Sequence, residues 1–134
     1  MLKTVIFWPA IAMAALIVLS YVNIGRARAA ALRSGEVKDT DFAPGTEPAA
    51  SATGRRLIAN QFELPMLFFV VIGFLFAIDG VSFIELLLAW AFVVLRALHM
   101  VGLLRGPLNL RRWSFMGSFA VVVALWVALA IRLL

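Results

Sequence analysis

The stretch VIFWPAIAMAALIVLSYVNI, from Val5 to Ile24, is apolar over nearly its whole length and contains no charged side chain. A helix rises about 1.5 Å per residue, so a run of this length covers the ~30 Å hydrocarbon core of a bilayer. We therefore predict a membrane-spanning helix over about residues 4–25. The chain is therefore expected to fold in a lipid bilayer rather than in water.

A secretory signal peptide is the alternative interpretation of this run, because Ala27-Arg28-Ala29 resembles a small-x-small cleavage site. Signal peptides have apolar cores of about 7–15 residues that follow a basic segment. In this chain only Lys3 precedes a longer apolar run that starts close to Met1. We expect the segment to be retained as the first span.

The whole chain has the composition of a membrane protein. Of its 134 residues 64% are hydrophobic and 14% are charged, whereas soluble domains have about 45–50% apolar and about 25% charged residues. The net charge of +5 suits a nucleic-acid binder, but membrane proteins collect basic residues in cytoplasmic loops, so we expect no nucleic-acid partner. The absence of cysteine excludes disulfides and thiolate metal sites, and one histidine is too few for a zinc site. We expect no metal.

Three further apolar runs follow the first. Leu64 to Ile78 reaches spanning length only if its helix starts near Arg56, and the other two runs are Val81 to Leu104 and Trp113 to Leu134. We predict an all-α, integral membrane four-helix bundle that forms a single domain over residues 1–134. The predicted spans cover about residues 4–25, 57–78, 81–104 and 113–134.

The connections between the spans differ in charge. The loops 26–56 and 105–112 hold most of the basic residues, whereas the opposite side has only Lys3 and Arg132. The positive-inside rule therefore places both loops in the cytoplasm and both chain ends on the other side. Within the first loop, FAPGTEPAASATG at Phe42 to Gly54 is the best candidate for local disorder.

Other residues are expected to serve the fold. Asp79 and Glu85 lie at the outer face, where we expect them to be solvated or to form the turn between the second and third spans. Small residues let helices approach closely in lipid. Those expected at helix contacts are Gly73, Ala77, Gly102, Gly117 and Ser118.

Three polar residues of the second span repeat at helical spacing. Arg56, Asn60 and Glu63 are separated by four and three residues, so they fall on one face of a helix. A charge at the centre of a bilayer costs at least about 2.5–3.5 kcal/mol, so charged residues that lie there usually pair with another group or bind a ligand. The face can hold a ligand with both carboxylate and ammonium groups. The alternative is an Arg–Glu pair between helices that only stabilises packing.

Basic residues near the predicted cytoplasmic face form the second group of candidates. Arg96 and His99 lie one turn apart near the end of the third span, and they could pair with Glu63 or bind an anionic ligand. Arg96 could equally extend to the interface, and His99 could be a hydrogen-bonded core residue. Juxtamembrane arginines usually set topology or contact lipid phosphates, which is the alternative for the third loop. Its arginines are Arg105, Arg111 and Arg112.

These residues resemble the MAPEG family, the membrane-associated proteins in eicosanoid and glutathione metabolism. RLIANQFELPMLF from Arg56 resembles the family signature R-x-x-x-N-x-x-E at the start of the second helix. The R-x-x-H at Arg96 and His99 and the basic third loop agree with it, and the resemblance covers nearly the whole chain. The chain looks most like the bacterial branch of the family.

The resemblance implies a homotrimer with sites between neighbouring subunits, open to the cytoplasmic side, in which glutathione is the co-substrate. Arg56, Asn60 and Glu63 match the residues that bind its charged ends. His99 occupies the position at which family members often have a tyrosine that helps to bind glutathione. Arg111 is the match for the arginine that stabilises the thiolate, and it is the catalytic candidate. Arg96 and Arg105 are further candidates for binding the peptide.

The sequence also departs from the family pattern. Leu64 and Leu103 stand where family members commonly have tyrosine, and Arg111 aligns only with a one-residue insertion in the third loop. We therefore carry two functions forward. The first is a glutathione-dependent transferase or peroxidase acting on lipophilic electrophiles. The alternative is a non-catalytic scaffold or accessory subunit of a larger complex.

A small transporter is a third possibility, which we reject because the first span has no acidic residue. The resemblance and the charge distribution together imply an integral protein of the bacterial inner membrane, in contact with lipids.

Overall fold

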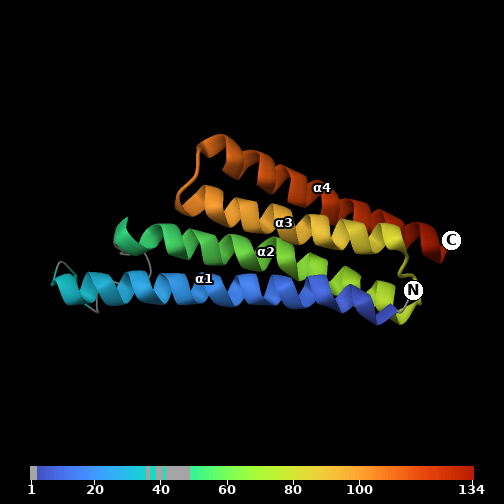
Figure 1. Ribbon diagram of the computed structural model, residues 1–134, viewed down its shortest axis with the longest axis horizontal. Helices are drawn as coiled ribbons and strands as arrows, with labels where there is room; N and C mark the ends of the chain where they lie inside the picture. The colour runs from blue at the N-terminus through green and yellow to red at the C-terminus, as the bar shows by residue number, and fades with distance from the viewer. Residues whose placement is uncertain (1–2, 36, 39–40, 42–48) are drawn as a thin grey trace.

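The computed structural model describes residues 3–35, 37, 38, 41 and 49–134. Within this part the chain forms four α-helices, which are preceded by a short 3-10 helix, η1, at Lys3–Ile6. The α-helices are α1 at Phe7–Ser34, α2 at Ala49–Ala77, α3 at Phe83–Leu104 and α4 at Leu108–Leu133. They run up and down beside one another, so both chain ends lie at the same end of the bundle (Figure 1).

Each helix contains a segment long and apolar enough to cross a membrane. These segments are Lys3–Ser34, Ile58–Ala77, Phe83–Leu104 and Leu108–Leu133. Because every backbone group inside a helix is hydrogen-bonded within the segment, a helix is one of the few structures that lipid tolerates. The predicted all-α four-helix bundle is confirmed.

The helices extend further into the predicted loops than the apolar runs alone indicate. α1 continues past residue 25 to Ser34, because its last turns consist mainly of alanine, arginine and leucine, which favour helix in or out of lipid. It ends at Gly35, which has a left-handed φ of 74°, and the Gly35 N–H donates to the carbonyl of Leu32. A glycine in this conformation is the usual C-terminal signal of a helix.

The other helix boundaries also differ from the apolar runs. α4 begins at Leu108, directly after Pro107, and so includes Arg111 and Arg112 in its first turns. α2 begins at Ala49, so the last part of the segment that we expected to be disordered, 49–54, is helical. The remainder of that segment, 42–48, lies outside the described residues.

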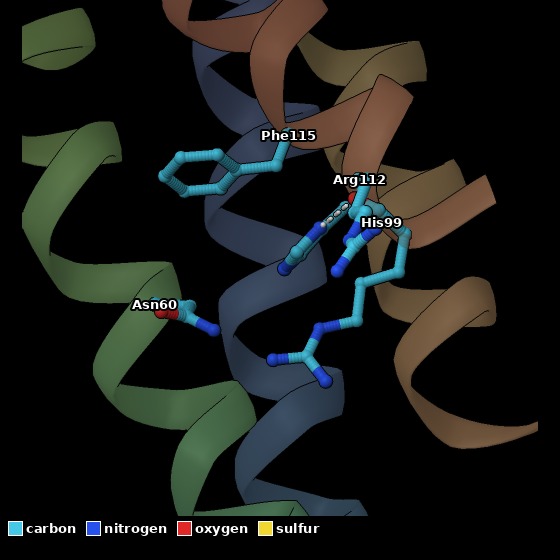
Figure 2. Close-up of a pocket in the computed structure, with 5 residues that line it drawn as sticks. Asn60, His99, Arg112 and Phe115 are labelled. Atoms are coloured by element: carbon cyan, nitrogen blue, oxygen red, sulfur yellow. Dashed lines mark hydrogen bonds between the residues drawn. The ribbon is translucent and has the colours of Figure 1, made fainter. Parts of the chain in front are cut away.

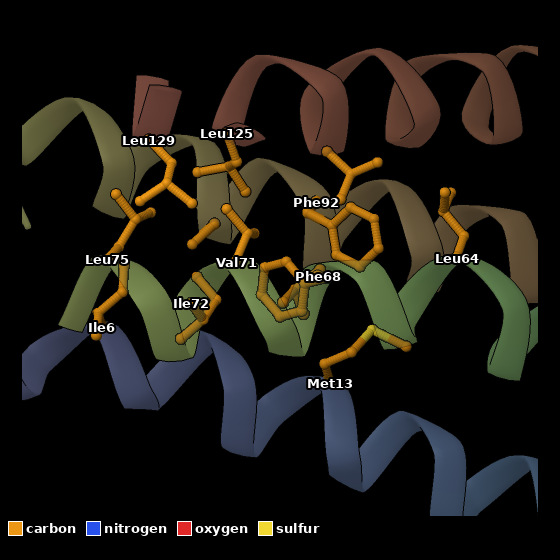
Figure 3. Packing of buried hydrophobic residues seen from close by; sticks show 13 residues of the cluster. Ile6, Met13, Leu64, Phe68, Val71, Ile72, Leu75, Phe92, Leu125 and Leu129 are labelled. Atoms are coloured by element: carbon orange, nitrogen blue, oxygen red, sulfur yellow. The ribbon is translucent and has the colours of Figure 1, made fainter. Parts of the chain in front are cut away.

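The apolar core joins all four helices, and Figure 3 shows its side chains packed between them. The rings of Phe68 from α2 and Phe92 from α3 stack at its centre, with centroids 4.4 Å apart. Met13 joins the core from α1, and Leu125 and Leu129 join from α4. The buried polar residues Gln61, Arg96 and His99 lie toward the end of the helices where the α3–α4 hairpin is.

Some of the small residues expected at helix contacts lie between α3 and α4, and others lie on the exposed face of α2. A Cβ atom added to Gly102 would lie 2.8 Å from the backbone nitrogen of Arg111, so this glycine allows α3 and α4 to approach closely at their hairpin. A Cβ atom added to Gly117 would lie 3.2 Å from the end of the Leu95 side chain, so this glycine also faces α3, with more room than Gly102 has. Gly73 and Ala77, in contrast, are exposed on α2, and nothing lies within 4 Å of a Cβ added to Gly73. The expectation that they contact another helix is not met within one protomer.

At the end of the bundle that carries both termini, charged residues are paired. Glu85 is only 3% exposed, and its Oε1 atom accepts hydrogen bonds from Nε and Nη2 of Arg132 at 3.0 and 2.9 Å. Its other oxygen accepts from the backbone and hydroxyl of Ser82, which completes a capping box at the start of α3. The expectation that Glu85 is solvated is therefore wrong, because Arg132 reaches it from α4.

Asp79 does occupy the turn between α2 and α3, where it is exposed and has a φ of 56°. Its Oδ1 lies 2.7 Å from Nζ of Lys3, and Lys3 also lies over the ring of Phe76. The N-terminal segment is thus tied to the turn that follows α2.

Candidate functional site

A pocket of about 250 Å³ opens at the hairpin end of the bundle. Three helices line it: α2 with Asn60, α3 with His99, and α4 with Arg111, Arg112 and Phe115. Figure 2 shows Asn60 on α2 facing His99 and the residues of α4 across the pocket. Of the seven residues that the sequence marked as candidates, the structure brings Asn60, His99 and Arg111 together here.

The α3–α4 hairpin holds His99 in one orientation. Its Nδ1 atom lies 3.0 Å from the carbonyl oxygen of Arg111, and a carbonyl can only accept, so Nδ1 is the donor. The close approach of α4 at Gly102 makes this contact possible. His99 is 2% exposed, its ring lies 5.6 Å from that of Phe115, and its Nε2 has no hydrogen-bond partner in the described part of the chain.

Arg96 is fully buried one turn before His99. Its Nε and Nη2 atoms donate to Oε1 of Gln61 at 3.2 and 3.0 Å, and Nη2 also donates to the backbone carbonyl of Asn60. Neither of the alternatives for Arg96, a pair with Glu63 or extension to the interface, describes this arrangement. Arg96 instead joins α3 to the α2 backbone directly beside the residue that lines the pocket.

Glu63 is exposed, and within the described residues no ion pair links it to Arg56 or Arg96. The reason is helical geometry: Glu63 lies about 200° around α2 from Gln61, which is the residue that faces Arg96. Arg56 is exposed on the same side of α2 as Glu63. The one-face pattern of Arg56, Asn60 and Glu63 therefore points away from the core, and Asn60 lies at its inner edge.

Arg105 lies outside the pocket. It is exposed at the end of α3 and lines a separate hollow of about 450 Å³ with Asn23, Val101 and Leu104. Arg56, Glu63 and Arg105 thus do not line the pocket that contains Asn60, His99 and Arg111 within a single protomer.

Three residues at this site do not stand out in the sequence pattern. Gln61 lies between the motif positions Asn60 and Glu63, and the only signal that marks it is that an amide side chain in an apolar span is costly. Arg112 ends a basic loop, where the pattern indicates a topology signal or a lipid contact, and Phe115 is one of many apolar residues in the run 113–134. The start of α4 at Leu108 places both of them beside the pocket.

Several buried polar atoms at this end lack a protein partner. They are Gln61 Nε2, Arg96 Nη1 and His99 Nε2 among the described residues. A buried polar group without a hydrogen bond costs about 1–3 kcal/mol, so this arrangement favours a polar ligand or ordered water at the site. Among the same residues no group of three or more histidine, cysteine, aspartate or glutamate side chains forms a metal site. Arginine donors predominate, and they suit an anion.

Comparison with known proteins identifies the family. The model of the MAPEG family matches residues 5–131. No curated protein and no solved structure matches the chain. The family match covers nearly the whole chain, including α1, α2, α3, α4 up to residue 131, and the pocket. The protein therefore belongs to the MAPEG family and is an integral membrane four-helix bundle of that family.

Proposed function

We propose that this protein is a glutathione-dependent transferase or peroxidase that acts on lipophilic electrophiles at the cytoplasmic face of the membrane. The observation that carries the proposal is the pocket lined by Asn60, His99, Arg111 and Arg112. Glutathione is the thiol co-substrate, and its two carboxylates and single ammonium group give it a net negative charge. Arginine forks bind carboxylates in a bidentate manner, so the donor set of the pocket suits this peptide.

Arg111 is the proposed catalytic cation. A thiol with a pKa of about 8.5 becomes more acidic beside a positive charge, and the thiolate is the nucleophile. Arg111 is half-buried at the pocket, where less water screens its charge than at the surface. Arg112 lines the same pocket and is exposed, so it is placed to bind a carboxylate of the peptide.

The protein is proposed to act as a homotrimer in which a neighbouring subunit completes the site. A charge such as Glu63, exposed on the span Ile58–Ala77, is costly if it faces lipid. Gly73 on α2 is exposed as well, and small residues are typical of helix contacts in membranes. The pocket of about 250 Å³ is also smaller than the ~300–1,000 Å³ usual for small-molecule sites. A neighbour packed on this face of α2 would cover Arg56 and Glu63 and enlarge the site.

The electrophile is proposed to reach the site through the bilayer, where apolar molecules concentrate. Between α2 and α4 lies an apolar groove of about 420 Å³, whose lining includes Leu67, Phe119 and Val123. The proposed location is the bacterial inner membrane. The positive-inside rule supports placing the pocket and the basic α3–α4 hairpin in the cytoplasm, with both chain ends outside.

A non-catalytic scaffold is the second candidate, and two observations favour it. Arg96 already donates to Gln61 and to the Asn60 carbonyl within the protomer, so two of its three nitrogen atoms are used by the protein itself. Leu64 and Leu103 also provide no hydroxyl where the resembled family commonly has one.

A glutathione titration separates the two candidates. The purified protein in detergent should show saturable ultraviolet absorbance of the thiolate as glutathione is added. Arg111→Ala should abolish this signal, because the thiolate loses its nearest proposed cation. The control Arg33→Ala removes an exposed arginine in the last turn of α1, far along the chain from the pocket, and should leave the signal unchanged. Absence of binding at millimolar glutathione would exclude the enzyme and leave the scaffold.

A further inference from the structure

We propose that His99 is the general base of this site, and that its Nε2 atom accepts the proton of the glutathione thiol. This inference rests on the proposed function and assigns the destination of the proton. Forming a thiolate breaks the S–H bond and leaves the electron pair on sulfur. An arginine stabilises the resulting anion but has only donors, so it does not take up the proton.

The hydrogen bond to α4 selects the tautomer that the base requires. His99 Nδ1 carries the hydrogen because it donates to the Arg111 carbonyl at 3.0 Å. In a neutral imidazole the other nitrogen, Nε2, then has a free lone pair. Nε2 is buried and without a partner among the described residues, and Figure 2 shows this side of the ring directed away from α4, toward the side of the pocket where Asn60 lies.

The other side chains that line the pocket are not bases. They are the amide of Asn60, the guanidinium groups of Arg111 and Arg112, and the ring of Phe115. The charged groups around the imidazole are Arg96 from α3 and Arg111 and Arg112 from α4, whereas α2 presents the neutral Asn60 and Gln61. Glu63 on α2 is exposed and does not line the pocket.

Transfer of the proton from sulfur to Nε2 is balanced in charge. It forms an N–H bond and a thiolate–imidazolium pair, so the total charge of the cation-rich pocket does not change. With an epoxide as the electrophile, the thiolate forms a carbon–sulfur bond while the carbon–oxygen bond breaks, and the electron pair of that bond stays on the oxygen as an alkoxide. The imidazolium then returns the proton to this oxygen, and the neutral imidazole is regenerated.

The chain contains one histidine, so its imidazole can be observed directly. Nitrogen NMR of the histidine-labelled protein in detergent should show protonated Nδ1 and unprotonated Nε2 in the free protein. Addition of glutathione should protonate Nε2, whereas S-methylglutathione, which has no thiol proton, should not. A free protein with hydrogen on Nε2, or a bound thiolate beside an unprotonated Nε2, would overturn the proposal.

A variant provides a second test. His99→Gln retains an amide donor for the Arg111 carbonyl but has no basic nitrogen. It should slow thiolate formation in stopped-flow measurements by about 100-fold, the lower end of the usual general-base contribution, while the affinity for S-methylglutathione stays unchanged. An unchanged rate would overturn the role as base, and so would equal losses of rate and S-methylglutathione affinity. If the unmodified protein binds neither peptide, the proposed function itself fails.

Discussion

The two ends of this bundle differ in how their charged side chains are partnered. At the end with the chain termini, the buried Glu85 is paired with Arg132 and hydrogen-bonded to Ser82, and the exposed Lys3 is paired with Asp79. At the hairpin end, Arg96 has only neutral acceptors, and polar atoms of Gln61, Arg96 and His99 lack partners within the described chain.

The presence or absence of complete hydrogen bonds distinguishes a charged group that serves the fold from one that is available to bind a ligand. An ion pair whose hydrogen bonds are complete has nothing left with which to bind a ligand. A buried cation beside free donors and a free lone pair is costly unless something else completes it. The hairpin end is therefore where we propose that a ligand binds, whereas the pair of Glu85 and Arg132 at the terminal end joins α3 to α4.

The largest effect on stability is expected from Arg132→Ala. It leaves the buried Glu85 carboxylate with Ser82 as its remaining partner. We expect a loss of about 3 kcal/mol in the free energy of unfolding in detergent, the lower end for removing one partner of a buried pair. Lys3→Ala is the matched control, because its partner Asp79 is exposed and such pairs contribute about 1 kcal/mol or less. Equal losses in the two variants would remove the distinction between the buried and the exposed pair.

A smaller loss is expected from Gln61→Leu at the other end. Leucine removes the side-chain acceptor of Arg96 and leaves only the Asn60 carbonyl. Hydrogen bonds to charged groups contribute about 1.5–3 kcal/mol, and we expect a loss in that range by chemical unfolding. S-methylglutathione binding should also weaken, because Arg96 holds the backbone of α2 at Asn60.

Gln61→Glu is the matched variant, since it keeps an acceptor of the same length and supplies an opposite charge to Arg96. We expect it to be at least as stable as the unmodified protein. If it lost as much stability as Gln61→Leu, the view that Arg96 lacks a compensating charge would be wrong.

A loss no larger than that of Gln61→Leu is expected from Gly102→Ala, which tests the hairpin that orients His99. The added methyl group would lie 2.8 Å from the Arg111 nitrogen, and overpacking of this kind costs about 1–3 kcal/mol. Because the crowded atoms belong to the α4 backbone rather than to a flexible side chain, we place the loss at about 2 kcal/mol, with a shift of the histidine nitrogen signals. Gly25→Ala is the control, since nothing lies within 4 Å of its added Cβ, and it should be neutral or slightly stabilising. An unchanged histidine spectrum in Gly102→Ala would show that this close approach does not orient His99.

Much of the fold could be predicted from apolar length alone. The apolar runs 5–24 and 113–134 fall almost entirely on η1 with α1 and on α4, and both helices extend beyond these runs at the end of the bundle opposite the chain termini. Those extensions could not be seen in hydropathy, because alanine and arginine form helix in water as well as in lipid. The start of α4 at Leu108 matters most, since it places Arg111 and Arg112 on a helix rather than in a loop.

The candidate site was predictable only in part. The spacing of Arg56, Asn60 and Glu63 places them on one side of α2, but spacing does not say which side faces the core. Gln61, one residue along from Asn60, is the residue that faces Arg96. The charge of Glu85 predicts a surface position. Glu85 is buried because α4 runs back to the end of the bundle where α3 begins and brings Arg132 into contact with it.

The sequence by itself determined the solvent, the number of helices and the family, because apolar length and motif spacing are local properties of the chain. The tertiary structure decided which polar residues meet. Hydrogen bonds between Arg96 and Gln61, between His99 and the Arg111 carbonyl, and between Arg132 and Glu85 join residues on different helices. Their existence depends on helix rotation and on close approach at Gly102, and packing sets both.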